Sequence, residues 1–207
     1  SKKYAKYGDD DVRYETFYNF ENVLIHYAIL HKLSHAFEKG LVEEKTAQNL
    51  FGISVTDSHF PPTLLNMQKF EKVSFALLIN FNTEVIVKVI LRCLTQKNAP
   101  DQFYNTIGAL LSHLSLSDAD HKKRILYTMA LIRNGLHSNG IHTKATVSPY
   151  LIKGHTFEFV KGKEIRCATW SHLCAAFERI LEVLEEVVDS SKVSAFVEQM
   201  PWYYSPL

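Results

Sequence analysis

Residues 117–140 read SDADHKKRILYTMALIRNGLHSNG and predict one helix with a defined start and end. Ser117 is a good N-cap, and Asp118 and Asp120 would lie in the first turn, where the helix dipole favours acids. Asn139-Gly140 ends the helix, because this pair readily adopts the left-handed conformation found after helix C-termini. The chain is therefore expected to contain a core helix that reaches from about 118 to 138.

Apolar residues recur at steps of three and four through most of the remaining chain, which predicts further amphipathic helices. These helices are expected over residues 14–37, 42–50, 64–94, 101–114, 169–188 and 193–200. The stretch 64–94 is long enough to be either two helices or one bent helix. Pro61-Pro62 is expected to close the loop before it, and Asp101 can cap the helix that follows.

Residues 148–165 change from helical spacing to alternation, which predicts a β-hairpin at about 148–162 around Lys153-Gly154-His155. The alternating apolar positions are Tyr150, Ile152, Phe157 and Phe159. Residues 1–12 are charged and are expected to be flexible, and residues 201–207 form an aromatic tail. The expected fold class is all-α: one domain over 1–207, a helical bundle with a small β-hairpin insertion.

Composition limits the classes of function. Hydrophobic residues make up 46% of the chain and charged residues 22%, which is typical of a globular domain. The formal net charge of +1 argues against a protein that coats long nucleic acid, so an RNA substrate would be bound locally. No P-loop, dinucleotide-binding or Gly-x-Ser-x-Gly motif occurs, so nothing supports P-loop nucleotide hydrolysis or esterase chemistry.

The cysteines and the apolar segments bear on location. Three cysteines without a Cys-x-x-Cys pair argue against a disulfide framework or a structural zinc site, and no cofactor is expected. No window of 18 uninterrupted apolar residues and no signal-peptide pattern is present. We therefore expect no membrane span and a cytoplasmic location.

An arginine and a histidine share the apolar face of the helix over 118–138. At about 100° per residue, Arg133 and His137 fall about 20° either side of Leu126, on the face that should point to the core. A guanidinium is costly there unless it has partners. Three arrangements resolve the cost: a buried carboxylate, an interface where polar groups meet, or a cleft that receives a phosphate. Gly135 lies between them and costs about 1 kcal/mol of helix stability relative to Ala, which suggests room for a close partner.

The phosphate cleft gives both side chains a natural role. Arg133 would hold an anion with its bidentate fork, and His137 would move a proton near neutral pH. Asn139 and His142 follow the helix and could approach the same cleft, although a polar left-handed turn explains Asn139 as well. Basic residues gather at two places, which could contact substrate or be ordinary solvated lysines. They are Lys122, Lys123, Arg124 and Arg133, and then Lys153, Lys161, Lys163 and Arg166.

The motif Arg133-Asn134-x-x-His137, late on a bundle helix, resembles the signature of HEPN domains. These are small helical bundles found in many toxins and antiviral nucleases. The resemblance implies metal-independent RNA cleavage in a composite cleft between two copies, with the ribose 2′-hydroxyl as nucleophile. Arg133 would then stabilise the phosphorane, His137 would act as general acid or base, and Asn134 would orient the site. The family usually places four to six residues between Arg and His, whereas three intervene here, which keeps both on one helical face.

The resemblance therefore implies a homodimeric endoribonuclease that cleaves single-stranded RNA as a toxin or antiviral effector, with Arg133, His137 and Asn134 as catalytic residues. Asn139, His142, Lys122 and Arg124 are the expected substrate-binding residues. One alternative is a non-catalytic helical module that binds a toxin–antitoxin or defence-system protein, and another is a small-molecule binding bundle. His31 and His35 lie one turn apart and could share a metal, but ordinary amphipathic-helix histidines explain them better.

Overall fold

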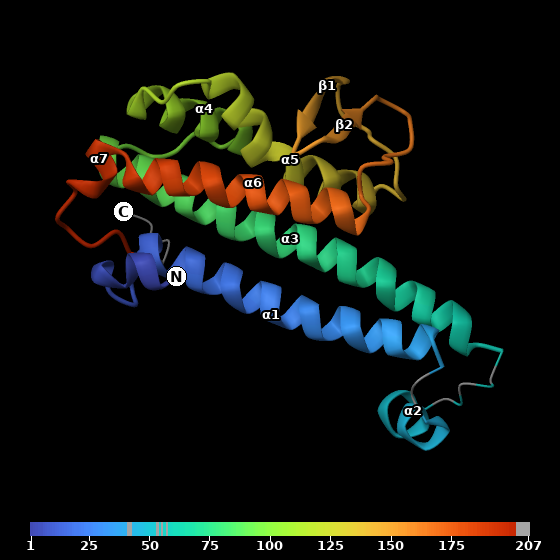
Figure 1. Ribbon diagram of the computed structural model, residues 1–207. Coiled ribbons are helices and arrows are strands. Elements are labelled where there is room, and N and C mark those ends of the chain that lie inside the picture. The colour runs from blue at the N-terminus through green and yellow to red at the C-terminus, as the bar shows by residue number, and fades with distance from the viewer. Residues whose placement is uncertain (41–42, 53, 55, 57, 202–207) are drawn as a thin grey trace.

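Two long helices, α1 (Val12–Glu38) and α3 (Phe60–Thr95), run side by side along the length of the molecule (Figure 1). The structure is a computed structural model that describes residues 1–40, 43–52, 54, 56 and 58–201. The short helix α2 (Glu44–Phe51) lies at the far end of this pair (Figure 1). The fold is mostly helical with one small two-stranded antiparallel sheet, which confirms the all-α class.

The remaining helices cover α3 on its other side. They are α4 (Phe103–Leu114), α5 (Ala119–His137), α6 (Trp170–Asp189) and the single turn α7 (Ser191–Ser194). The helix α5 packs against three other helices, α3, α4 and α6. Residues from Ile125 to Ile132 are buried on nearly every side of α5, and not along one stripe only. Arg133 therefore lies where this all-round burial ends.

The hairpin confirms the change of period seen in the sequence. Its strands are β1 (Val147–Ile152) and β2 (His155–Phe159), which pair antiparallel with Ile152 opposite His155. Lys153 and Gly154 connect them with positive φ angles of 47° and 81°, as a tight two-residue turn requires. The apolar side chains of β2 are buried in the core, and the sheet packs against α6, with Tyr150 of β1 hydrogen-bonded to Thr128 of α5.

Several helix boundaries differ from the sequence-based expectation. The stretch expected to be two helices or one bent helix is the single 36-residue helix α3. Pro61 and Pro62 do not close a loop but occupy its first turn, where the missing amide hydrogen would have had no partner in any case. The N-caps of α4 and α5 are Gln102 and Asp118, each without a side-chain cap hydrogen bond, and not Asp101 and Ser117. The helix expected at 193–200 is only the turn α7.

The N-terminal residues, which were expected to be flexible, form a 3-10 helix over Lys2–Tyr7. Tyr4 is buried and stacks on Phe17 with 4.5 Å between ring centroids. Of the expected aromatic tail, only Pro201 belongs to the described residues, where it forms a β-bridge with Asp11. Residues 202–207 lie outside them.

A buried ion pair joins the two ends of the described chain. Arg13 and Asp11 are both fully buried, with 2.6 Å between Arg13 Nη2 and Asp11 Oδ2. Asp11 also accepts a hydrogen bond from the Met200 amide at 3.0 Å. The remaining guanidinium hydrogens of Arg13 are donated to three backbone carbonyls, those of Val193, Phe196 and Glu198. Every guanidinium donor of Arg13 is therefore used, and the arginine ties the start of α1 to the segment after α6.

By length and composition alone, α3 could also cross a membrane, whereas no membrane span was expected. More than half of its most apolar window is buried inside the molecule, against α1, α4, α5 and α6. Core helices of soluble proteins pass the same test, so this property is a weak indication.

Candidate functional site

Arg133 lies one turn before the end of α5 and is only partly buried. Its Nε atom is buried and has no hydrogen-bond partner. Within the described residues, none of the ion pairs formed by acidic side chains involves Arg133. Of the three arrangements that would make this position tolerable, pairing with an internal carboxylate is therefore not the one observed. Among the described residues, the guanidinium of Arg133 therefore carries its charge without a carboxylate partner.

Arg133 interacts electrostatically with Tyr127 of the same helix. Burial raises the pKa of Tyr127, and the charge of Arg133 offsets part of this rise. Tyr104 and Glu84 also act electrostatically on Tyr127. The Glu84 carboxylate is paired with Lys88, with 2.5 Å between Oε1 and Nζ, so it has a cationic partner on its own helix.

His137 is the last residue of α5, and its side chain is exposed. The helix closes just after it, where the Ser138 amide donates to the carbonyls of Asn134 and Gly135 at 3.2 and 3.0 Å. His137 follows Arg133 by four helical steps, which is about 6 Å along the axis. A solvent-exposed imidazole thus stands one turn from a guanidinium whose buried Nε has no hydrogen-bond partner. The sequence placed both side chains on the face toward the core, but only Arg133 is partly buried there and His137 is exposed.

Gly135 makes room for a close neighbour, and that neighbour belongs to the same chain. A Cβ atom at this position would lie 2.7 Å from Ile165 Cδ1 and 3.1 Å from its Cγ2. The Ile165 amide also donates to the Gly140 carbonyl at 2.8 Å. The segment that follows the hairpin is therefore held directly against the last turn of α5.

Two of the expected substrate-binding residues lie away from this pair. Lys122 is buried, with its Nζ 2.5 Å from Oε2 of Glu186 on α6. It also stands eleven residues before Arg133, which is about 16 Å along the helix. Arg124 is placed beside the hairpin, where its charge acts on the Tyr150 hydroxyl. Neither cation is positioned next to His137.

The other two expected substrate-binding residues, His142 and Asn139, follow α5 and differ in their exposure to solvent. His142 is buried, with Nε2 2.9 Å from the Ala145 carbonyl oxygen and its ring against Phe159. It belongs to the packing under the hairpin and does not face an open cleft. Asn139 is exposed and has a φ of 54°, the left-handed turn weighed as the simpler explanation. Of the four expected substrate-binding residues, Asn139 alone is both exposed and next to His137 in the chain.

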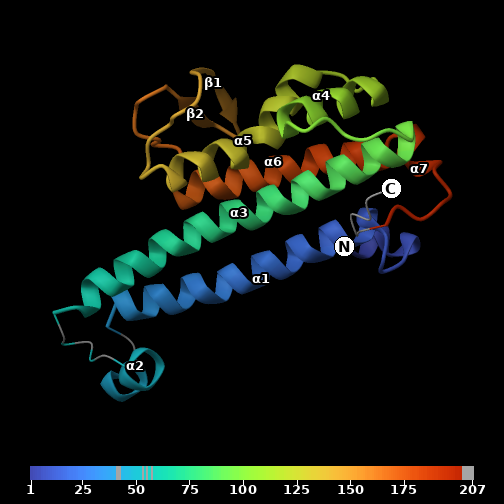
Figure 2. The same cartoon turned by 180° about the vertical axis from the view of Figure 1, so that it is seen from behind.

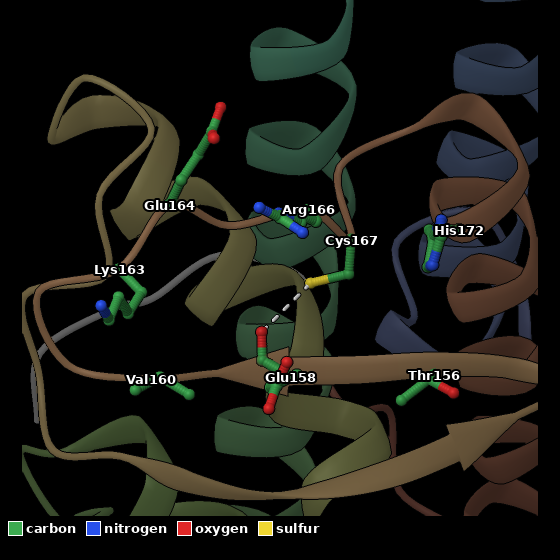
Figure 3. A pocket seen from close by; sticks show the side chains of 8 residues that line it. All are labelled: Thr156, Glu158, Val160, Lys163, Glu164, Arg166, Cys167 and His172. Atoms are coloured by element: carbon green, nitrogen blue, oxygen red, sulfur yellow. Dashed lines mark hydrogen bonds between the residues drawn. The ribbon is translucent and has the colours of Figure 1, made fainter.

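The second basic cluster borders a hollow of about 620 Å³ beside β2 (Figure 3). Lys163 and Arg166 line it, but so do Glu158 and Glu164, so the lining charges balance. Lys153 is elsewhere, paired with Glu178 and Glu182 of α6. The hollow therefore lacks the positive excess that a nucleic-acid backbone needs.

The histidine pair on α1 shows no sign of metal ligation. His31 and His35 have ring centroids 6.5 Å apart, and His31 packs against Trp170 of α6. In the part of the chain that the structure describes, no group of three or more His, Cys, Asp or Glu side chains is arranged to hold a metal ion. The packing interpretation suffices.

Sequence reasoning missed Tyr104 and the relation of Lys123 to it. Lys123 Nζ lies 3.7 Å from the centre of the Tyr104 ring, which in turn contacts Tyr127. Lys123, Tyr127 and Asn134 follow one another at helical steps of four and seven, a spacing that could have placed them on one face. Tyr104 is on another helix, so no local pattern could have brought it to this face.

Comparison with models of protein families, with curated proteins and with solved structures gives no match to this chain.

Proposed function

We propose that this protein is a metal-independent endoribonuclease of the HEPN type that cleaves single-stranded RNA. One observation carries the proposal: Arg133 is part-buried with an unpartnered Nε, and the solvent-open His137 stands one turn away on the same helix. A guanidinium beside an imidazole is the pair of groups that phosphodiester cleavage needs, an anion holder and a proton carrier. The resemblance of Arg133-Asn134-x-x-His137 to the HEPN signature supports the same chemistry.

The reaction follows from these roles. A base takes the proton of a ribose 2′-hydroxyl, whose oxygen attacks the neighbouring phosphorus. The bond from phosphorus to the 5′ oxygen breaks, and an acid returns a proton to that oxygen. The products are a 2′,3′-cyclic phosphate and a 5′-hydroxyl. Arg133 would stabilise the extra negative charge of the phosphorane, and His137 would serve one of the two proton transfers.

The second proton carrier would come from a second copy of the chain. Exposed apolar side chains follow one face of α3 at steps of seven, one and three, and we call them the outer stripe: Phe70, Leu77, Leu78 and Phe81. Phe70 is 71% exposed and Phe81 is 56% exposed, so large aromatic groups face water here. Such contiguous apolar surface marks an interaction site. Figure 2 shows α3 on an open side of the molecule, with no helix in front of it.

Phe81 of the outer stripe stands one helical turn before Glu84, which acts electrostatically on Tyr127, as Arg133 does. A homodimer that covers the outer stripe would bring two Arg133–His137 pairs toward each other. The same surface favours the alternative of a helical module that docks a toxin–antitoxin or defence-system partner. A cytoplasmic toxin or antiviral role is part of the proposal.

The test is cleavage of single-stranded RNA in the presence of EDTA. Wild-type protein should cut it, while Arg133→Ala and His137→Ala should each lose about 100-fold or more of the rate. Arg124→Ala is the matched control, since it removes an arginine from the same helix on the hairpin side. Equal trace activity in all four proteins would indicate a contaminating nuclease and would leave only a non-catalytic module.

A further inference from the structure

An aromatic and basic group lies next to the Arg133–His137 pair and has no role in the chemistry above. We call it the Tyr104 platform: Tyr104 at the start of α4, with Lys123 and Tyr127 of α5. The ring centroids of Tyr104 and Tyr127 are 5.1 Å apart at an interplanar angle of 63°, an edge-to-face contact. Tyr104 is 42% exposed, so much of its ring faces solvent. The edge-to-face contact holds the ring without covering all of its surface.

Lys123 is held close to Tyr104 by the shape of α4. A Cβ atom at Gly108 would lie 3.0 Å from Lys123 Nζ and 3.3 Å from its Cε, so the glycine leaves space for the lysine stem. The ammonium group sits 3.7 Å from the Tyr104 ring centre, within cation–π distance. Among the described residues, no carboxylate forms an ion pair with Lys123. The platform thus combines an exposed ring with an unneutralised cation.

Tyr127 links the platform to Arg133. The phenol of Tyr127 is close enough to both Tyr104 and Arg133 for each to act on it electrostatically. Tyr127 and Arg133 are six helical steps apart on α5, about 9 Å along the axis and about a third of a turn around it. The exposed ring therefore lies between two cations, Lys123 and Arg133, that both act at short range on the tyrosine pair. This order matches a strand whose bases stack while its phosphates meet positive charge.

We infer that Tyr104 is a specificity-determining residue that stacks on an unpaired RNA base beside the scissile phosphate. The inference rests on the proposed function and deepens it. A base inside a duplex cannot offer its face to a protein side chain, so the platform selects single strands. Lys123 would contact a phosphate next to that base. The stacking is sequence-tolerant, because every base has a π face.

The test measures binding separately from cleavage. The probe is a short single-stranded RNA with 2′-O-methyl groups throughout, which lacks the free 2′-hydroxyl and cannot be cut. Tyr104→Leu keeps apolar bulk but removes the ring, and it should weaken binding by about 5- to 100-fold. Tyr104→Phe keeps the ring and should bind within about twofold of wild type. Tyr18→Leu removes a similarly exposed tyrosine from α1 and is the matched control.

An abasic scan identifies stacking as the cause. One abasic position in the probe should weaken binding to wild type, and the same change should have no effect on Tyr104→Leu. Equal binding by wild type and Tyr104→Leu would overturn the inference, and so would a scan in which no abasic position weakens binding to wild type. If polyglutamate displaces the probe and no abasic position weakens binding, the platform binds acidic peptides. That result would also overturn the inference. Cleavage of unmodified RNA separates the two proposals. If the variants bind the probe in the stated pattern but the wild type cuts no RNA, the nuclease proposal fails and the platform remains.

Discussion

Ile165 lies so close to Gly135 that any side chain at 135 would require the isoleucine to move, since a Cβ atom there would stand 2.7 Å from Ile165 Cδ1. The isoleucine follows the hairpin, and the glycine is in the last turn of α5, between Arg133 and His137. The return segment of the hairpin therefore braces the turn that carries the candidate site. This contact fixes the backbone of the turn from which Arg133 and His137 project.

Gly135→Ala should destabilise the protein despite the better helix propensity of alanine. Alanine gains about 1 kcal/mol in a helix, whereas overpacking of this kind costs about 1–3 kcal/mol. The free energy of unfolding in urea should fall, and RNA cleavage should fall with it, because Ile165 would push on the turn of His137. The measurement is a urea titration followed by circular dichroism.

The matched rescue is Gly135→Ala combined with Ile165→Val, which removes the methyl nearest the new Cβ. It should recover most of the lost stability, although Ile165→Val alone costs about 0.5–1.5 kcal/mol. Additive losses in the double variant would contradict the close contact described above.

Arg13→Met tests the buried ion pair that joins the two ends of the described chain. Removing the arginine leaves Asp11 buried without its cation, and breaking such a pair costs about 3–5 kcal/mol. Lys3→Met is the control, because Lys3 pairs with Asp189 at the exposed surface, where such a pair contributes about 0–1 kcal/mol. Both variants are compared by urea unfolding. Losses of equal size would mean that the buried pair does not hold the C-terminal segment.

Stability should also depend on pH through His172. Burial, and then the charge of nearby His155, lower the pKa of His172 in the folded protein. The unfolded chain then binds a proton at a higher pH than the folded one, so stability is full above about pH 6.5 and falls as pH drops below it. His172→Gln should flatten this part of the profile when unfolding is followed at a series of pH values. An unchanged slope would show that other groups carry the acid sensitivity.

The outer stripe gives a prediction about assembly. Leu77→Lys and Phe81→Glu place charges on it and should convert a dimer into a monomer in sedimentation experiments, with loss of RNA cleavage. Leu151→Lys, at an exposed leucine of the hairpin, should change neither property. A wild-type monomer with full activity would contradict the composite site.

Local signals in the sequence predicted most of the elements, because helix periodicity and the switch to alternation depend on neighbours in the chain. The N-caps were harder: Asp118 and Gln102 take those positions without a side-chain hydrogen bond, where propensity favoured Ser117 and Asp101. The order at the N-terminus could not be predicted, since it depends on Arg13 meeting carbonyls about 180 residues away.

For the candidate site, the sequence supplied Arg133 and His137 because both lie on one turn. It could not show that Lys122 is paired with Glu186 or that His142 is buried under the hairpin, since both depend on tertiary packing. Tyr104 was missed for the same reason. Its place beside Tyr127 exists only because α4 folds back on α5.

The central claim is most directly tested by the chemistry of the cut ends. A DNA oligonucleotide that carries a single ribonucleotide is incubated with wild type and with His137→Ala in EDTA, and the products are identified by mass spectrometry. We predict cleavage only on the 3′ side of the ribonucleotide, with a 2′,3′-cyclic phosphate and a 5′-hydroxyl, and its loss in His137→Ala. Cleavage elsewhere in the DNA, a 5′-phosphate product, or equal cutting by His137→Ala would contradict the account.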